Sequence, residues 1–307
     1  MTDRQTLPAL PDTLAIAVAA ASDVGGRPSN EDVALAIELT GAGSAGDAPP
    51  AFLLAVADGM GGHAGGEVAS RLAIETIRDV VAPGEGGDAA LLLKQAFRRA
   101  NEAIVAEAEA TGADGMGTTL TAAILRGKYA TVASVGDSRA YLLRGRGVTQ
   151  VTKDHSLVAE QVARGELTPD EARASPRRNV LTHALGTQPK LARDLPAVFE
   201  LTLLPEDRLL LCTDGFHDVL EQNDYARILA AAAPEEAVDR LIRMANERGT
   251  TDNVSAAVAV AVPTRIPTAL PTPTSARGIP VGAIAAAAIA AILILLLVAA
   301  LLLGVVP

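Results

Sequence analysis

Residues 52–59 read FLLAVADG, six apolar residues that end abruptly in an aspartate and a glycine. A short apolar run followed by a turn dipeptide is typical of a buried β-strand that stops at the edge of its sheet. The pattern recurs at residues 209–215, LLLCTDG, where Asp214 takes the place of Asp58. Two buried strands that each end in a carboxylate predict a layered sheet structure with acidic groups at its edge.

Working outward, the hydrophobic pattern predicts further strands and several helices. Hairpins and grouped helices, without alternating β-α-β units, favour an α+β layered architecture. Residues 14–21, LAIAVAAA, are read as a first strand, with a signal peptide as the open alternative. The other predicted strands are 118–125, 129–135, 141–144, 198–204, 208–212 and 252–262, and the predicted helices are 67–81, 89–110, 156–164, 169–174, 225–233 and 235–247.

The composition excludes several classes of protein. The chain has 307 residues and a formal net charge of −10, which argues against nucleic-acid binding. Its single cysteine, Cys212, rules out a disulfide framework and fits a reducing compartment. Long apolar segments argue against general disorder.

The end of the chain predicts a membrane anchor. Residues 281–306 contain only Ala, Ile, Leu, Val and Gly, and a helix of this length would be roughly 39 Å long, against a bilayer core of about 30 Å. A buried core helix is the alternative, but such a helix normally has a polar face. Arginines precede the span and no charge follows it, which places the preceding residues in the cytoplasm. Residues 263–280 contain five prolines and are predicted to be an extended linker.

Four aspartates stand at the ends of apolar strands: Asp58, Asp137, Asp214 and Asp252. Taken singly, each is an ordinary turn residue. Together they could converge at one end of a sheet, where their charges would repel each other unless compensated. Oxygen-rich clusters without histidine or cysteine select Mg²⁺ or Mn²⁺, and two such ions form a site for phosphoester hydrolysis.

A candidate phosphate ligand lies next to a further acidic pair. Arg27 precedes Glu31 and Asp32 by four and five residues. A planar guanidinium can hold two phosphate oxygens at once, whereas lysine acts as a point charge. A surface salt bridge is the alternative interpretation of Arg27.

Seven motifs of the chain, in their order along the sequence, resemble those of the metal-dependent protein phosphatases in their bacterial form. This is the PPM family of 2C-type serine/threonine phosphatases. The resemblance covers residues 13–262, with 1–12 as an N-terminal tail and about 154–188 resembling the mobile flap of bacterial members. The motifs are Ser22-Asp23-Val24-Gly25-Gly26-Arg27-Pro28-Ser29-Asn30-Glu31-Asp32, Asp58-Gly59-Met60-Gly61-Gly62-His63, Gly117-Thr118-Thr119, Gly136-Asp137-Ser138-Arg139, Asp154-His155-Ser156, Thr213-Asp214-Gly215 and Asp252-Asn253-Val254.

The resemblance implies a four-layer α-β-β-α sandwich of two antiparallel sheets, followed here by one C-terminal transmembrane helix. It also implies two to three Mn²⁺ or Mg²⁺ ions in a cleft at one end of the sheets. Asp58 would bridge two of these ions. Glu31, Asp214 and Asp252 would complete one of them, directly or through water, and the carbonyl of Gly59 would bind the other.

The remaining site residues follow from the same motifs. Asp137 and Asp218, together with Asp214, would hold a third, weaker ion. Arg27 would bind the substrate phosphate, and Asp32 would orient a metal-bound water. These are the expected catalytic and metal-binding residues.

The resemblance therefore implies metal-dependent hydrolysis of phosphoserine and phosphothreonine in proteins by a metal-activated water. The expected location is the inner face of a bacterial cell membrane, and the expected partners are membrane serine/threonine kinases and their substrates, not nucleic acid. A catalytically weak PPM-like regulatory protein and a purely structural tail-anchored protein are the alternatives. Many eukaryotic members have histidine where Met60 stands, so the acid that protonates the leaving group is unassigned.

Overall fold

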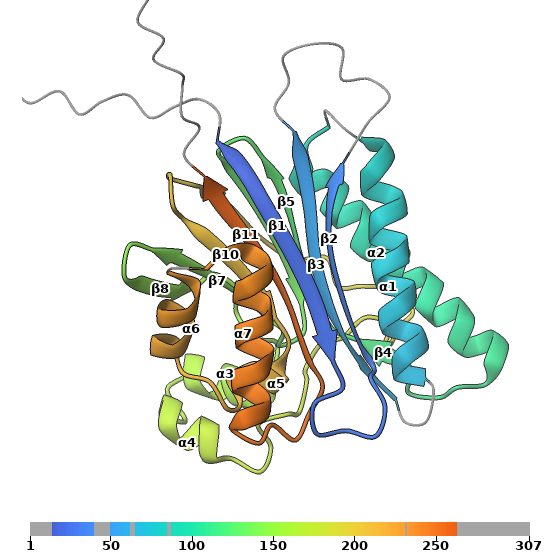
Figure 1. The fold of residues 1–307 in the computed structure, drawn as a ribbon. Helices are drawn as coiled ribbons and strands as arrows, with labels where there is room; N and C mark the ends of the chain where they lie inside the picture. The colour runs from blue at the N-terminus through green and yellow to red at the C-terminus, as the bar shows by residue number, and fades with distance from the viewer. Residues whose placement is uncertain (1–13, 40–49, 62–64, 85–86, 231, 263–307) are drawn as a thin grey trace, which may run out of the picture. The chain divides into compact units, whose positions relative to one another are not determined.

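Two antiparallel sheets form the centre of the computed structural model, which describes residues 14–39, 50–61, 65–84, 87–230 and 232–262 (Figure 1). The first sheet contains, in spatial order, β1 (Ala15–Asp23), β11 (Val254–Val262), β10 (Arg208–Cys212), β7 (Arg139–Arg144) and β8 (Gly147–Gln150). The second sheet contains β2 (Asp32–Leu39), β3 (Ala51–Met60), β5 (Leu120–Arg126), β6 (Tyr129–Val135) and β9 (Ala197–Thr202), and the short β4 (Gly117–Thr118) pairs with the end of β3.

Helices cover the outer faces of both sheets (Figure 1). Helices α1 (Gly65–Val81) and α2 (Ala89–Thr111) pack on the second sheet, and α6 (Gln222–Leu229) and α7 (Pro234–Glu247) pack on the first. The remaining helical pieces are η1 (Ala82–Gly84), α3 (Leu157–Ala163), α4 (Pro169–Ala174) and α5 (Asp214–His217).

The strands alternate their side chains between two apolar layers. In β3, Leu53 and Ala55 pack beneath α1 and α2, whereas Leu54 and Val56 face the first sheet. Small residues such as Ala257 occupy the layer between the sheets together with larger ones such as Phe52. Burial on both faces explains why β3 reads as a continuous apolar run.

The predicted first strand is confirmed, because β1 pairs with β11 from Ala15↔Val262 to Asp23↔Val254. Strands β2 and β8 and the short helix α5 are absent from the elements predicted above. Strand β2 contains an apolar run of its own at residues 33–37 and is half-buried along most of its length, so it could have been predicted from the pattern. The predicted helix at 225–233 begins earlier, at Gln222, because Glu221 and Asp224 form a capping box at its start.

No helix within the ranges that the structure describes is both long and apolar enough to cross a bilayer. The predicted transmembrane helix at 281–306, the linker at 263–280 and the tail at 1–12 lie outside those ranges.

Candidate metal centre

Asp32 and Asp58 face each other at the end of the second sheet, where β2 and β3 pair in the register Asp32↔Asp58. Hydroxyl groups from other strands hold both residues. Thr213 Oγ1 donates to Asp32 Oδ2 at 2.8 Å, and the Asp58 amide donates to Thr119 Oγ1 at 3.0 Å. Thr118 Oγ1 also donates to the Asp58 carbonyl oxygen at 2.8 Å, which fixes the backbone of this residue.

The carboxylates at this end are buried close enough to perturb one another. Burial raises the pKa of Asp58 well above its usual range, and the charges of Asp32, Asp214, Asp137 and Asp252 raise it further. Burial likewise raises the pKa of Asp32 to about 7, and burial with the charges of Asp252 and Asp218 raises that of Asp214 to about 6. Ionising all of these buried carboxylates together is costly unless cations lie nearby.

The donor set fits hard divalent cations. Asp214 Oδ1 is buried and has no hydrogen-bond partner, so it is free to bind an ion. Within the described residues, no three Asp, Glu, His or Cys side chains converge enough to hold an ion by themselves. Mg²⁺ and Mn²⁺ characteristically keep several waters and bind through only one or two carboxylates, which is the kind of arrangement these residues could complete.

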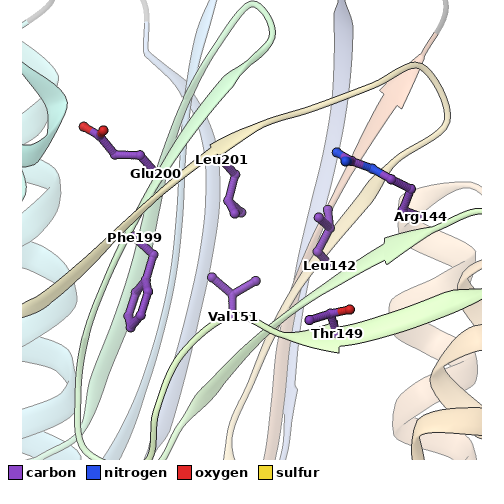
Figure 2. Close-up of a pocket in the computed structure, with 7 residues that line it drawn as sticks. All are labelled: Leu142, Arg144, Thr149, Val151, Phe199, Glu200 and Leu201. Carbon is purple, nitrogen blue, oxygen red and sulfur yellow. The ribbon is translucent and has the colours of Figure 1, made fainter.

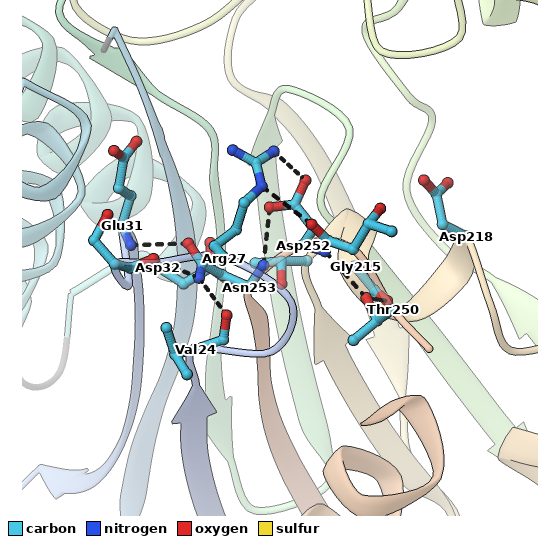
Figure 3. A network of polar contacts seen from close by, with 12 residues as sticks. Val24, Arg27, Glu31, Asp32, Gly215, Asp218, Thr250, Asp252 and Asn253 are labelled. Atoms are coloured by element: carbon cyan, nitrogen blue, oxygen red, sulfur yellow. Dashed lines mark hydrogen bonds and ion pairs between the residues drawn. The ribbon is translucent and has the colours of Figure 1, made fainter. Parts of the chain in front are cut away.

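Arg27 lies at the rim of the same cluster (Figure 3). Its Nη2 donates to Asp252 Oδ2 at 2.6 Å and its Nε donates to the Thr251 carbonyl oxygen at 3.2 Å. Because 53% of the Arg27 side chain is exposed, the guanidinium remains accessible to a ligand from solvent.

Asn253 ties the loop that carries Arg27 to the first sheet (Figure 3). Its Oδ1 accepts from the Glu31 amide at 2.9 Å, and its Nδ2 donates to the carbonyl oxygens of Val24 and Ser29 at 2.8 Å each. Asn253 thus aligns Glu31 and Arg27 with the neighbouring Asp252.

Glycines allow Glu31 to approach the junction of β3 and α1. The Gly59 amide donates to the Glu31 carbonyl oxygen at 3.1 Å. A Cβ atom on Gly59 would lie 2.1 Å from the Gly66 carbonyl oxygen, and one on Gly66 would lie 2.3 Å from Glu31 Oε2. Side chains at either position would push the predicted metal ligands apart.

Asp137 and Asp218 lie beside Asp214, on the side of the first sheet. Asp137 occupies the turn between β6 and β7 and is 7% exposed, and burial with the charge of Asp214 raises its pKa well above the usual range. Asp218 follows α5, and Arg178 Nη2 lies 3.5 Å from its Oδ2. The structure therefore brings the predicted site residues to one end of the two sheets, through shared hydrogen bonds or charges.

Sequence reasoning missed several supporting residues. Thr213, Thr119 and Asn253 stand inside the quoted motifs, which was the available signal, but their partners come from distant strands. His217 is a further omission: its Nε2 lies 3.3 Å from the Asp137 carbonyl oxygen, and burial lowers its pKa to about 3. Cys212 is fully buried in β10 and burial raises its pKa to about 12, so this thiol is not a nucleophile.

A cavity of about 390 Å³ lies apart from these carboxylates (Figure 2). It is lined from the edge-strand side of the sandwich by residues of β7, β8 and β9 and none of the predicted site residues contributes to it. The lining residues are Leu142, Arg144, Thr149, Val151, Phe199, Glu200 and Leu201.

The family model described as protein phosphatase 2C matches residues 44–259. The chain is 39% identical over 250 residues to the serine/threonine protein phosphatase PstP of Mycobacterium tuberculosis, covering 80% of this chain and 45% of PstP. It is 37% identical over 209 residues to the serine/threonine phosphatase stp of Listeria monocytogenes, covering 66% of this chain and 82% of that protein.

The solved structures agree with the sequence relatives. The catalytic domain of PstP in complex with two manganese ions superposes with a TM-score of 0.70 at 38% identity, covering 81% of this chain and all of that chain. The Staphylococcus aureus phosphatase Stp1 gives a TM-score of 0.70 at 30% identity, covering 85% of this chain and 99% of that chain.

The sheets, the acidic cluster and these similarities define one class of protein: the chain belongs to the protein phosphatase 2C family of serine/threonine phosphatases. It spans somewhat less than half the length of the mycobacterial relative that it matches, and most of the length of the Listeria relative.

Proposed function

We propose that this chain hydrolyses phosphoserine and phosphothreonine in proteins with the help of two to three Mn²⁺ or Mg²⁺ ions. The observation that carries the proposal is the cluster of buried, mutually repelling carboxylates with an unpartnered oxygen on Asp214. Membership of the phosphatase family and the two manganese ions in the PstP structure support it.

The ligand assignment is also part of the proposal. Asp58 would hold two ions, Glu31, Asp214 and Asp252 would hold one of them, and the Gly59 carbonyl oxygen would hold the other. When bound, the ions would lower the pKa of a water molecule and neutralise phosphate charge. The cluster of carboxylates that repel one another in the metal-free chain would then become a stabilising ligand set.

Arg27 and Asp32 would act on the substrate side of the site. Arg27 is exposed and charged, and its two terminal nitrogens can hold two phosphate oxygens. Asp32 is held in place by Thr213, which would position its carboxylate to orient an attacking water.

The remaining expectations are proposals about the whole protein. We propose that the phosphatase domain, residues 13–262, is held at the inner face of a bacterial membrane by residues 281–306. Phosphorylated membrane kinases and their substrates would then be its partners. The apolar, uncharged C-terminal sequence supports this placement.

The activity is tested on the full chain with p-nitrophenyl phosphate and a phosphothreonine peptide, in the presence of Mn²⁺ or of EDTA. Asp58→Asn removes the proposed bridging charge and should abolish turnover. Asp239→Asn makes the same chemical change at an exposed position of α7 and should leave turnover unchanged. If the wild type shows no Mn²⁺-dependent hydrolysis, or if Asp58→Asn equals it, the chain is instead a PPM-like binding protein.

A further inference from the structure

His217 is a buried histidine that contacts two of the predicted ligands. Its side chain is 10% exposed, and it lies at the end of α5, the helix that begins at Asp214. Nε2 lies 3.3 Å from the backbone carbonyl oxygen of Asp137, and Nδ1 lies 3.9 Å from Asp218 Oδ1. One imidazole ring therefore lies between the turn that carries Asp137 and the carboxylate of Asp218.

The hydrogen bond to Asp137 fixes the ring. A carbonyl oxygen can only accept, so Nε2 must carry the hydrogen that it donates. The His217 ring is buried, so this hydrogen bond helps to fix the orientation of the ring. The orientation of the ring in turn limits the space left for Asp218 beside it.

The turn that carries Asp137 needs such support. Gly136 has a φ of +105°, and a Cβ atom there would lie 2.6 Å from Thr119, so the turn crosses between the two sheets in a narrow space. The Gly136 amide donates to His155 Nδ1 at 3.1 Å on one side. His217 supplies the bond to the next residue, Asp137, from the other sheet.

The carboxylates around His217 act on one another, although Arg139 partly offsets the charge near Asp137 and Arg27 that near Asp214. The charge of Asp214 acts on Asp137, and the charge of Asp218 acts on Asp214. Asp214 Oδ1 is buried without a hydrogen-bond partner. Arg178 reaches only Asp218, at 3.5 Å, from a side chain that is itself 46% exposed.

We infer that His217 is a positioning residue for a third divalent cation held by Asp137, Asp214 and Asp218. The inference rests on the proposed function, because it presupposes the metal-binding cleft. His217 itself does not touch the cation. It holds the Asp137 turn through its hydrogen bond and packs beside Asp218, as groups behind a metal ligand commonly do, while waters would complete the shell of the ion.

Two amide substitutions separate the hydrogen bond from the packing. His217→Gln places its nitrogen where Nε2 stands and can still donate to Asp137, whereas His217→Asn is too short to reach that carbonyl. Mn²⁺ binding to the full chain is followed by titration calorimetry, and melting temperatures in EDTA report the fold. Asp58→Asn serves as the control for the tighter ions.

We expect His217→Asn to weaken the weakest Mn²⁺ step by about tenfold or more, while the tighter steps stay unchanged and His217→Gln stays close to the wild type. Equal behaviour of the two variants at the weakest step, whether both bind normally or both fail, overturns the role of the hydrogen bond. A wild type that binds only two ions also overturns it, while leaving the proposed function intact. Failure of Asp58→Asn to remove the tighter ions counts against the proposed function instead.

Discussion

Arg27 has two alternative uses for its guanidinium, depending on what occupies the cleft. It pairs with Asp252, with Nη2 2.6 Å from Oδ2, and the hydrogen bond and charge of Asp252 contribute to raising the pKa of the arginine. A cation bound to Asp252 would take over that role. The guanidinium would then be free to hold phosphate.

Arg27→Ala should therefore raise KM for a phosphopeptide by about 10- to 100-fold, the range for lost charge-assisted hydrogen bonds. Mn²⁺ affinity should not fall, because the substitution removes a cation that competes for Asp252. Arg27→Lys is the control: it keeps the charge, loses the bidentate geometry, and should give an intermediate KM. If a loss of Mn²⁺ affinity accounts for the whole rise in KM of Arg27→Ala, Arg27 does not bind the substrate phosphate.

Asp32 makes the stability of the metal-free chain depend on pH in an unusual direction. Burial raises its folded-state pKa from 3.8 to about 7, so the native state binds more protons than the unfolded state between these values. Its contribution to stability is complete below pH 3.8 and is lost as the pH rises through about 7. Asp224 is different: Arg248 holds its pKa below the usual range, so its contribution is already constant above about pH 4.

In EDTA, the melting temperature should accordingly fall between pH 5.5 and 7.5, and saturating Mn²⁺ should reverse the trend at the upper end. Asp32→Asn should reduce the slope in EDTA, because residue 32 then has no proton to lose, whereas Asp214 and its neighbours still titrate. Differential scanning fluorimetry measures both curves. A melting temperature that rises across this interval without metal would show that the carboxylates are ionised in the native state.

At the scale of elements, the junction of β3 and α1 sets the position of Glu31. Gly65 and Gly66 are neighbours at the start of α1, yet their surroundings differ. A Cβ atom on Gly65 would lie 3.8 Å from Met116, an ordinary contact, whereas on Gly66 it would lie 2.3 Å from Glu31 Oε2 and 2.8 Å from the Gly59 backbone.

Gly66→Ala should lower kcat/KM by about 100-fold, the cost expected when a reacting group shifts by roughly 1 Å, and it should weaken Mn²⁺ binding. Gly65→Ala is the matched control and should be tolerated, since alanine favours a helix over glycine by about 1 kcal/mol. Steady-state kinetics with a Mn²⁺ titration compare the two. Equal kinetics of the Gly66→Ala and Gly65→Ala variants would show that activity does not depend on the present position of Glu31.

The sequence alone predicts many of the strands and helices. Strand β10 and helix α4 match their predicted bounds, because an apolar run and a capping box with Pro169 mark them locally. Strand β2 could have been recognised by the same pattern, because residues 33–37 are all apolar, although most of the strand is only half-buried. The hydrogen bond from the Thr213 hydroxyl to Asp32 could not be predicted from the sequence. The two residues are 181 positions apart and meet only in the folded protein.

At the scale of the whole molecule, the sequence divides into a phosphatase domain and an apolar C-terminal segment. Deleting residues 279–307 should release an active enzyme into the supernatant, because the uncharged span is removed and the domain is kept. Ultracentrifugation of lysates, with Mn²⁺-dependent hydrolysis measured in each fraction, tests this. Continued pelleting of the shortened chain would remove the case for an anchor at 281–306.

The pairing of β1 with β11 has a consequence for how the protein is made. The ribosome synthesises β1 first, yet its partner is the last strand of the domain, and residues 24–253 lie between them. At bacterial synthesis rates of about 5–20 residues per second, the first strand waits for tens of seconds with an unpaired edge. Strands β10, β7 and β8 can pair earlier, but β1 cannot join this sheet before β11 leaves the ribosomal tunnel, and Arg27 cannot contact Asp252 before residue 252 does. The proposed phosphatase site can therefore be assembled only after the whole domain has been synthesised.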